Sequence, residues 1–184
     1  MTPERRTTIL RIISLLAVVA ISVFIFSIRH QTRMLLALGY PGIFVISILA
    51  NATVLLPAPG VAMVFTMGAS PLFNPFWIGI IAGVGSAIGE LSSYMAGFSG
   101  QAVIENSAIY NKVHPYISKY GAATIFVLAA VPNPFFDLGG IAAGALKMPV
   151  RIFLTWCTLG KIIKMLAFAY AGAYSVHWVF KFMH

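Results

Sequence analysis

Residues 132–137 read Pro132-Asn133-Pro134-Phe135-Phe136-Asp137, and they interrupt an otherwise apolar part of the chain. The apolar arm before this break runs from Ala122 to Val131, and the arm after it runs from Leu138 to Leu146. An earlier break divides a second apolar part in the same way: residues 43–56 and 61–69 flank Pro57-Ala58-Pro59-Gly60. In each copy one long apolar segment then follows, so the same order of elements occurs twice.

The arms are too short to cross a bilayer. The later arms contain ten and nine residues, and the earlier arms contain 14 and nine. A nine-residue helix is about 14 Å long, whereas the hydrocarbon core is about 30 Å thick. The pattern predicts two re-entrant helical hairpins, whose breaks contain Pro57, Pro59, Gly60, Pro132 and Pro134. A long helix kinked at its prolines is the alternative, because proline does not always end a helix.

Composition indicates an integral membrane protein. The 184 residues are 60% hydrophobic and 9% charged, and the mean hydropathy is +0.93. A soluble domain carries about 25% charged residues. The net charge of +8 does not indicate nucleic-acid binding, because the Lys and Arg residues lie in short loops and at segment ends, as in membrane proteins. The single cysteine, Cys157, excludes an internal disulfide and is expected to be a packing residue.

The remaining apolar segments predict three full transmembrane helices, at residues 9–28, 76–97 and 152–180. We read residues 1–38 as an N-terminal transmembrane helix followed by a short interfacial helix or connecting loop. We read residues 39–180 as the main membrane domain, which the features below assign to transport. It comprises a first half, residues 39–98; a polar segment with a surface helix, residues 99–121; and a second half, residues 122–180.

Charge counting predicts that the two hairpins enter from opposite sides. If each hairpin returns to its own side, seven basic residues lie on one face and three on the other. The positive-inside bias then places the N-terminus in the cytoplasm and the C-terminus outside. The expected fold is therefore all-α, with three spans and two opposed hairpins in an inverted repeat, as in transporters with sites near the midplane.

Small and polar residues form one stripe on the segment 76–97. They recur at steps of three and four residues, which places them on one helix face: Gly79, Gly83, Ser86, Glu90, Ser93 and Gly97. Such stripes allow close helix packing, so the stripe should face protein, or a second copy in a homodimer. Glu90 would then contribute to transport, or would pair with a lysine as a packing contact.

Two further groups of residues are candidates for function. Asp137 lies in apolar surroundings, where an ionisable group is a functional candidate, but it could also cap the following helix. Asn133 could satisfy backbone groups at the hairpin tip. Lys161 and Lys164 share a helix face. They either lie near the interface or lie deep, where Glu90, Asp137 or a lipid phosphate would be the partner.

These residues resemble the VTT domain superfamily, which includes the DedA and SNARE-associated membrane proteins. The similarity rests on residues 132–137, on Gly139-Gly140-Ile141-Ala142-Ala143-Gly144, and on Lys147-Met148-Pro149 with Gly160-Lys161. It extends over about residues 39–176. The resemblance implies two opposed re-entrant hairpins and lipid transport, either polyprenyl-phosphate flipping or phospholipid scrambling. The DedA branch carries arginines around the second hairpin proline. Here Lys147, Arg151, Lys161 or Lys164 would supply that positive charge.

The sequence therefore predicts a membrane transporter of a lipid or lipid phosphate, of flippase or scramblase type. In one form of this prediction, transport is coupled to protons. The alternatives are a small-solute or ion transporter on the same scaffold, or a non-transporting membrane assembly factor. No enzymatic activity, metal or cofactor is expected. The expected partners are membrane lipids and a second copy of the chain, and the expected location is a bacterial or archaeal cell membrane. The candidate transport residues are Asp137, Glu90, Asn133, Lys161, Lys164 and Arg151.

Overall fold

The computed structural model describes residues 38–52, 60–100, 108–132 and 136–182, and these residues form eight α-helices. The first two helices are α3 (Tyr40–Ala52) and α4 (Gly60–Gly68). They are followed by α5 (Pro75–Gly89) and α6 (Leu91–Ser99). The second half contains α8 (Ala108–Tyr120), α9 (Ala122–Ala130), α10 (Phe136–Ala145) and α11 (Val150–Phe182). The all-α prediction is confirmed over this part of the chain.

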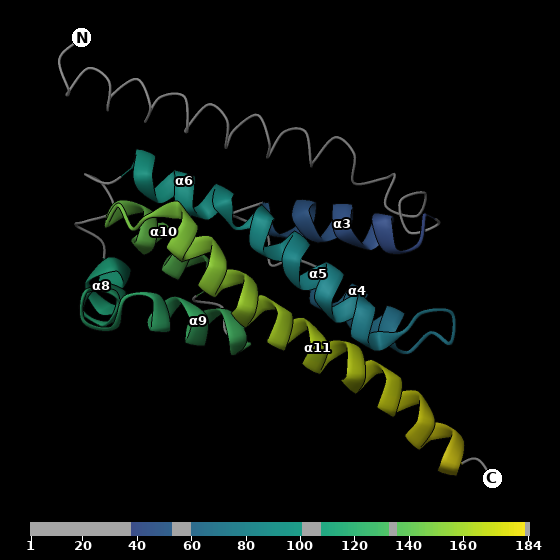
Figure 1. Cartoon of the computed structure of the whole chain (residues 1–184). Helices are drawn as coiled ribbons and strands as arrows, with labels where there is room; N and C mark the ends of the chain where they lie inside the picture. Colours follow the sequence, from purple (N-terminus) through teal and green to yellow (C-terminus); the bar gives the residue numbers. More distant parts are fainter. Residues whose placement is uncertain (1–37, 53–59, 101–107, 133–135, 183–184) are drawn as a thin grey trace, which may run out of the picture.

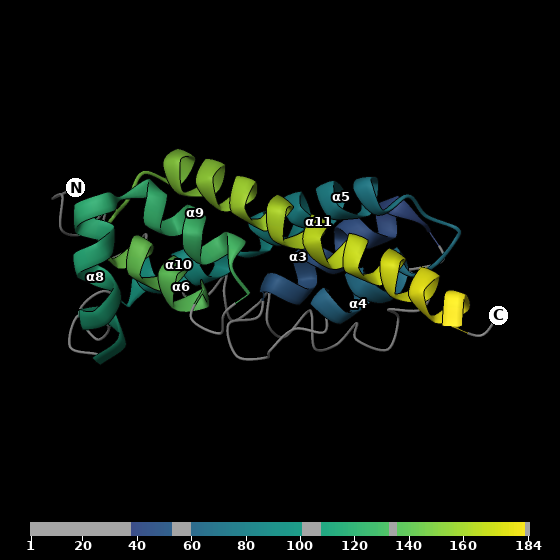
Figure 2. The same cartoon turned by 90° about the horizontal axis from the view of Figure 1, so that it is seen from below.

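Two helices are long and apolar enough to cross a membrane. The first is the nearly continuous pair α5 and α6, Pro75–Ser99, and the second is the Val150–Ser175 part of α11. They run in opposite directions (Figure 1) and cross each other in the view of Figure 2. The predicted first span, residues 9–28, and the interfacial segment, residues 29–38, lie almost wholly outside the described residues.

The other apolar helices are short, as the sequence predicts for the arms. Helices α3, α4, α9 and α10 contain 13, nine, nine and ten residues. Even the longest is about 20 Å long, which is less than the hydrocarbon core of about 30 Å. The break residues Pro57, Pro59 and Pro134 lie outside the described residues, while Gly60 is buried at the start of α4 and Pro132 is exposed. The arms are therefore present as separate helices, and their placement in a membrane stays a prediction.

Helix α4 packs on the long helix of the second half, and α10 packs on that of the first half. A Cβ at Gly68 of α4 would meet the backbone of Ala169 in α11, and a Cβ at Gly144 of α10 would meet the backbone of Tyr94 in α6. Gly144 follows Gly68 by 76 positions, and Ala169 follows Tyr94 by 75. The same contact therefore occurs twice, with nearly the same offset in the sequence.

The glycines on the long helices repeat this correspondence. Gly172 of α11 packs against the carbonyl group of Phe65 in α4, and Gly97 of α6 packs against the carbonyl group of Ile141 in α10. The offsets are again 75 and 76 residues. Because a Cβ at these glycines would clash with backbone atoms, only glycine permits the helices to approach this closely. The two halves thus share one packing scheme.

The first arms pack on the long helices of their own halves. Gly85 of α5 lies against Phe44 of α3, and Gly160 of α11 lies against Phe126 of α9. Gly83, by contrast, packs against Ile162 of α11. Gly85 is 75 positions before Gly160, as in the other contacts, whereas Phe44 and Phe126 are 82 positions apart.

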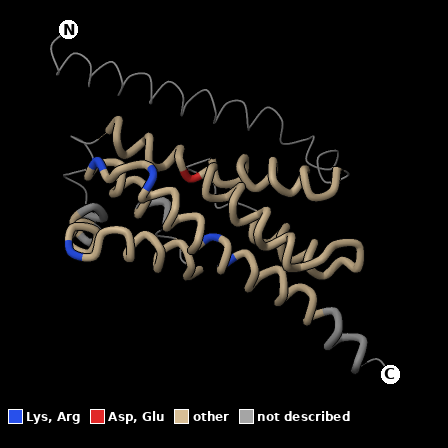
Figure 3. Tube along the Cα trace, in the orientation of Figure 1, with Lys and Arg blue, Asp and Glu red and all other residues tan. Residues whose placement is uncertain are grey.

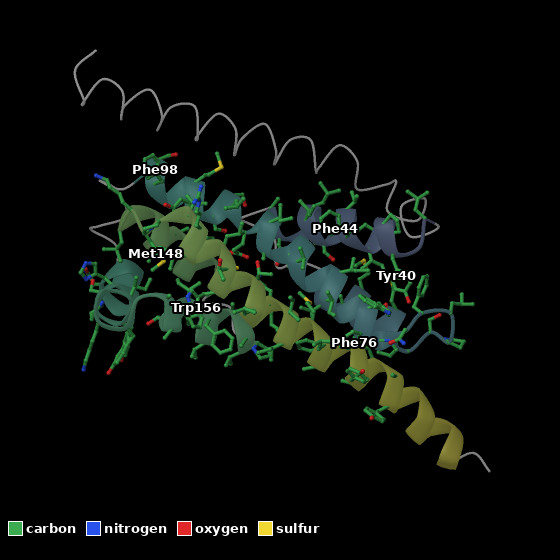
Figure 4. All side chains as sticks on the ribbon, viewed as in Figure 1. Tyr40, Phe44, Phe76, Phe98, Met148 and Trp156 are labelled. Carbon is green, nitrogen blue, oxygen red and sulfur yellow. The ribbon has the colours of Figure 1, made fainter. Side chains whose placement is uncertain are left out.

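The helix predicted in the polar segment is present as α8, and its position at the membrane surface stays a prediction. It lies across the ends of the other helices, and Figure 2 shows its axis turned away from that of α11. Its residue Ile117 is buried, whereas Tyr116 and Tyr120 are exposed. The α8 end of the molecule also contains Phe98 and Met148, and the opposite end contains Tyr40 and Phe76 (Figure 4).

Candidate functional site: a buried polar cluster where the long helices cross

A stripe of buried side chains runs along each long helix at steps of four residues. On α5 and α6 it consists of Ile78, Ala82, Ser86, Glu90 and Tyr94. On α11 it consists of Phe153, Cys157, Lys161, Met165 and Ala169. Residues four apart lie on one helix face, so these stripes face the protein interior. In both stripes polar residues occupy the middle and apolar residues occupy the ends.

The polar residues separate two apolar clusters. One cluster gathers around Tyr94, Phe153 and Cys157 and includes residues of α8, α9 and α10. The other gathers around Ile78 and Met165 and includes residues of α3 and α4. Between them we define the polar cluster as Asn51, Ser86, Glu90 and Lys161. The protein thus has a polar layer at the middle of its core, where burial without partners would be costly.

The centre of the polar cluster is an ion pair between the two halves of the chain. Lys161 Nζ lies 2.8 Å from Glu90 Oε2, and the two side chains are 3% and 0% exposed. The ammonium group also donates to Asn51 Oδ1 at 2.9 Å. Figure 3 shows that the described part of the chain has basic positions at the middle of α11 and one acidic position on the first half. Of the partners that the sequence left open for Lys161, the structure selects Glu90.

Asn51 connects α3 to both long helices. Its amide nitrogen donates to the Ser47 carbonyl oxygen at 3.0 Å and to Ser86 Oγ at 3.1 Å. Both amide hydrogens are therefore used, and the amide oxygen faces the lysine. Turning the amide over would point its donors at the ammonium group, so the charge of Lys161 fixes this orientation.

Glu90 lies at the junction of α5 and α6. The sequence predicted one uninterrupted helix here, and the structure divides it at this single residue. The backbone ladder still continues, because Glu90 N–H donates to Ser86 O and Tyr94 N–H donates to Glu90 O, at 3.1 and 3.2 Å. The carboxylate is therefore held on a nearly regular helix, which limits its freedom to move away from the lysine.

Helix α10 covers the polar cluster on the side of Glu90. A Cβ at Gly140 would lie 3.5 Å from Glu90 Oε1 and 3.0 Å from the Cβ of Ser93. The hydroxyl groups of Ser92 and Ser93 are buried and have no hydrogen-bond partner among the described residues. Buried hydroxyl groups ordinarily find a partner in protein or water, so Ser93, which lies beside Gly140 as Glu90 does, can offer a hydrogen bond at this side of the polar cluster.

The predicted stripe of small and polar residues faces protein, as expected. All six of its residues are buried. Gly79 and Gly83 lie against Leu166 and Ile162 of α11, and Gly97 lies against Ile141 of α10. The suggestion that this stripe forms a homodimer interface is therefore wrong, because helices of the same chain cover it.

The other candidate residues lie in different places. Lys164 is buried one turn beyond Lys161, whereas Arg151 is exposed near the start of α11. Asn133 lies outside the described residues. Asp137 is the second residue of α10, and its side chain is outside the described part, so its role in capping or in transport stays a prediction. Arg151 is therefore not part of the polar cluster.

Sequence reasoning missed Asn51 and Ser86 as a connected pair. Asn51 was counted within an apolar arm, although a polar amide in such a segment is itself unusual. Ser86 was recognised as part of a small-residue stripe and not as a hydrogen-bonding group. The local signal was present for both residues, but their connection spans 35 positions and cannot be found from local periodicity.

The fold and the polar cluster define a helical membrane protein with two long apolar helices that cross around a buried ion pair. The chain belongs to the VTT domain family, whose domain matches residues 56–174. This match includes Glu90 and Lys161 and confirms the resemblance seen in the sequence.

Two curated plant proteins are similar to part of the chain. The vacuole membrane proteins KMS2 and KMS1 of Arabidopsis thaliana are 32% and 33% identical to it, over 103 and 106 residues. Each match covers 46% of this chain but only 25% or 26% of the plant protein. The chain thus matches about a quarter of the length of these relatives. No solved structure matches the chain significantly.

Proposed function

We propose that this protein moves lipids across the bilayer, as a flippase or scramblase, and that the polar cluster is the point that the lipid headgroup passes. The observation that carries the proposal is the buried Glu90–Lys161 pair where the two long helices cross. Charged residues inside a membrane domain are costly and usually mark a transport pathway or a pairing contact. Membership of the VTT domain family adds to this reading.

The chemistry of the polar cluster suits a polar headgroup. A headgroup that leaves water loses hydrogen bonds, and the polar cluster offers donors and acceptors in their place. Lys161 supplies a cation and Glu90 supplies an anion, and Ser93, which like Glu90 lies beside Gly140, adds a buried hydroxyl group. In this proposal Lys164 and Asp137 belong to the same pathway, and an anionic headgroup exchanges with Glu90 as the partner of Lys161.

The short arms would open the pathway. Helices α4 and α10 each approach a long helix closely at glycines, and in this proposal they separate from that helix during transport. In the proposed topology the arms form two re-entrant hairpins from opposite sides, and the segment 9–28 adds a third span. The N-terminus is then cytoplasmic and the C-terminus is outside. The location proposed is a bacterial or archaeal cell membrane.

The test is a flip assay in proteoliposomes with a fluorescent phospholipid and a membrane-impermeant quencher, at two pH values. We expect faster loss of inner-leaflet fluorescence than in empty vesicles. Asn51→Leu and Lys161→Met should slow it. The matched controls are Asn111→Leu, at an exposed asparagine of α8, and Lys181→Met, at the last turn of α11. Flip rates equal to those of empty vesicles, with correctly folded protein, would exclude the proposal.

A further inference from the structure

A basic face lies at the α8 end of the molecule. Lys119 of α8, Lys147 of the α10–α11 turn and Arg151 of α11 are all exposed. Figure 3 shows basic positions gathered at this end, whereas the described residues of the opposite end show none. Among the side chains that the structure describes, the one acid is Glu90, which is buried in the core. Over residues 99–151 the sequence has four basic and two acidic residues.

Exposed tyrosines accompany the basic residues. Tyr116 and Tyr120 are 60% and 56% exposed, and Lys119 Nζ lies 5.0 Å from the centre of the Tyr120 ring. Tyrosine is enriched at membrane–water interfaces, and lysine can place its stem along apolar surface while its charge stays in water. Because α8 lies across the long helices (Figure 2), it would lie along the bilayer surface when those helices cross the bilayer.

The backbone at Lys147 gives an independent reason to assign this face a role. Lys147 has a φ of 55°, a left-handed conformation that disfavours residues other than glycine. It occupies the C′ position of α10, where Lys147 N–H donates to Gly144 O and Met148 N–H donates to Ala143 O, each at 3.0 Å. Glycine is the usual residue in this motif. A lysine at this position lowers stability relative to glycine. We therefore attribute its presence to the exposed positive charge that it carries.

We propose that Lys119, Lys147 and Arg151, together with Tyr116 and Tyr120, form a docking face for anionic phospholipid headgroups in the leaflet that this end faces. The argument for this occupant is charge complementarity, because a cytoplasmic leaflet containing anionic lipid attracts basic residues near its surface. The face would enrich anionic lipids around the protein. The proposal requires the chain to cross the membrane, but it does not require transport activity.

The test uses Trp156 as a reporter. Trp156 is 39% exposed and lies in α11 five positions after Arg151. The protein carries Trp77→Phe and Trp178→Phe and is placed in vesicles of phosphatidylcholine and phosphatidylglycerol. Brominated acyl chains, which quench tryptophan fluorescence, are carried by one lipid at a time. The ratio of the two quenching levels gives the preference for phosphatidylglycerol near Trp156.

We expect a preference for phosphatidylglycerol that weakens with added salt, because salt screens exposed charges. The variant Lys119→Gln/Lys147→Gly/Arg151→Gln should lose this preference. Each basic residue removed near the membrane surface should lower the preference for phosphatidylglycerol by roughly fivefold. The charge-matched control is Arg29→Gln/Arg33→Gln/Lys181→Gln, at basic residues that the sequence predicts on the opposite face; it should retain the preference. Lys147→Gly alone should raise the melting temperature while weakening the preference, which separates charge from folding.

The proposal is overturned by any of three results. The first is a wild-type protein without a preference, in which case the face serves an acidic macromolecule or no partner. The second is a triple variant that keeps the wild-type preference. The third is a control variant that loses as much preference as the triple variant, which would indicate a general effect of net charge.

Discussion

Breaking the Glu90–Lys161 pair from either side should destabilise the protein strongly. Removing one partner of a buried ion pair costs about 3–5 kcal/mol, because the other charge remains buried. Both side chains are almost completely buried, at 3% and 0% exposure, so the value for exposed pairs of about 0–1 kcal/mol does not apply. We therefore expect Glu90→Gln and Lys161→Met each to lower the free energy of unfolding by about 3–5 kcal/mol.

The double variant should be less destabilised than the sum of the single variants. Glu90→Gln/Lys161→Met contains no buried charge at these two positions, and the principal remaining cost is that Asn51 Oδ1 loses its donor. An unsatisfied buried acceptor costs about 1–3 kcal/mol. The coupling free energy between the two substitutions should thus be several kcal/mol, which is large for residues in contact.

Cys157 provides the assay. It is the single cysteine of the chain and is fully buried, and it lies one helical turn before Lys161. Labelling by a thiol-reactive dye in detergent therefore reports opening of the core. Under conditions in which opening is a rapid equilibrium, a loss of about 3–5 kcal/mol accelerates labelling by roughly 100- to 4,000-fold. Single-variant costs below about 1 kcal/mol, or costs that simply add, would refute the reasoning.

Three further predictions concern the packing around the polar cluster. Asn51→Leu should lower the free energy of unfolding by about 1–3 kcal/mol, because Ser86 and Lys161 each lose a hydrogen-bond partner. The rate of Cys157 labelling measures this loss, and an unchanged rate would contradict the assigned contacts. Gly68→Val and Gly144→Val should each destabilise the protein by at least about 1–3 kcal/mol, because the valine side chains would overlap backbone atoms. The control Ala62→Val, at an exposed position of α4, should not destabilise it. Similar melting temperatures for all three variants would contradict the close approach of the helices. Ser93→Ala should leave stability almost unchanged, since its hydroxyl has no partner among the described residues, but it should slow lipid flipping; an unchanged flip rate would exclude Ser93 from the pathway.

The sequence was sufficient to predict most of the helical elements. Hydrophobic runs and Pro-x-Pro breaks located α4, α9, α10 and α11 to within about two residues, because apolar length and proline act locally. The stripe that contains Glu90 was also assigned correctly to the protein interior. Its role in a dimer was wrong, because periodicity shows that a face is buried but does not show what covers it.

The polar cluster could be predicted only in part. Glu90 and Lys161 were candidates because a charge in an apolar segment is costly wherever it lies. Their pairing joins residues 71 positions apart, and the contact of Lys161 with Asn51 joins residues 110 positions apart. Such contacts depend on how the helices cross. Here the crossing depends on glycines such as Gly79 and Gly83, whose contacts cannot be read from the sequence alone.

The most direct test of the central claim is the lipid flip rate of Glu90→Gln/Lys161→Met in proteoliposomes, measured on protein whose Cys157 remains protected from labelling. If the ion pair is where the headgroup passes, the folded double variant should flip lipids at least about tenfold more slowly, an increase of about 1.4 kcal/mol in the barrier. A wild-type flip rate in the folded double variant would show that the pair serves packing alone, and would contradict the account.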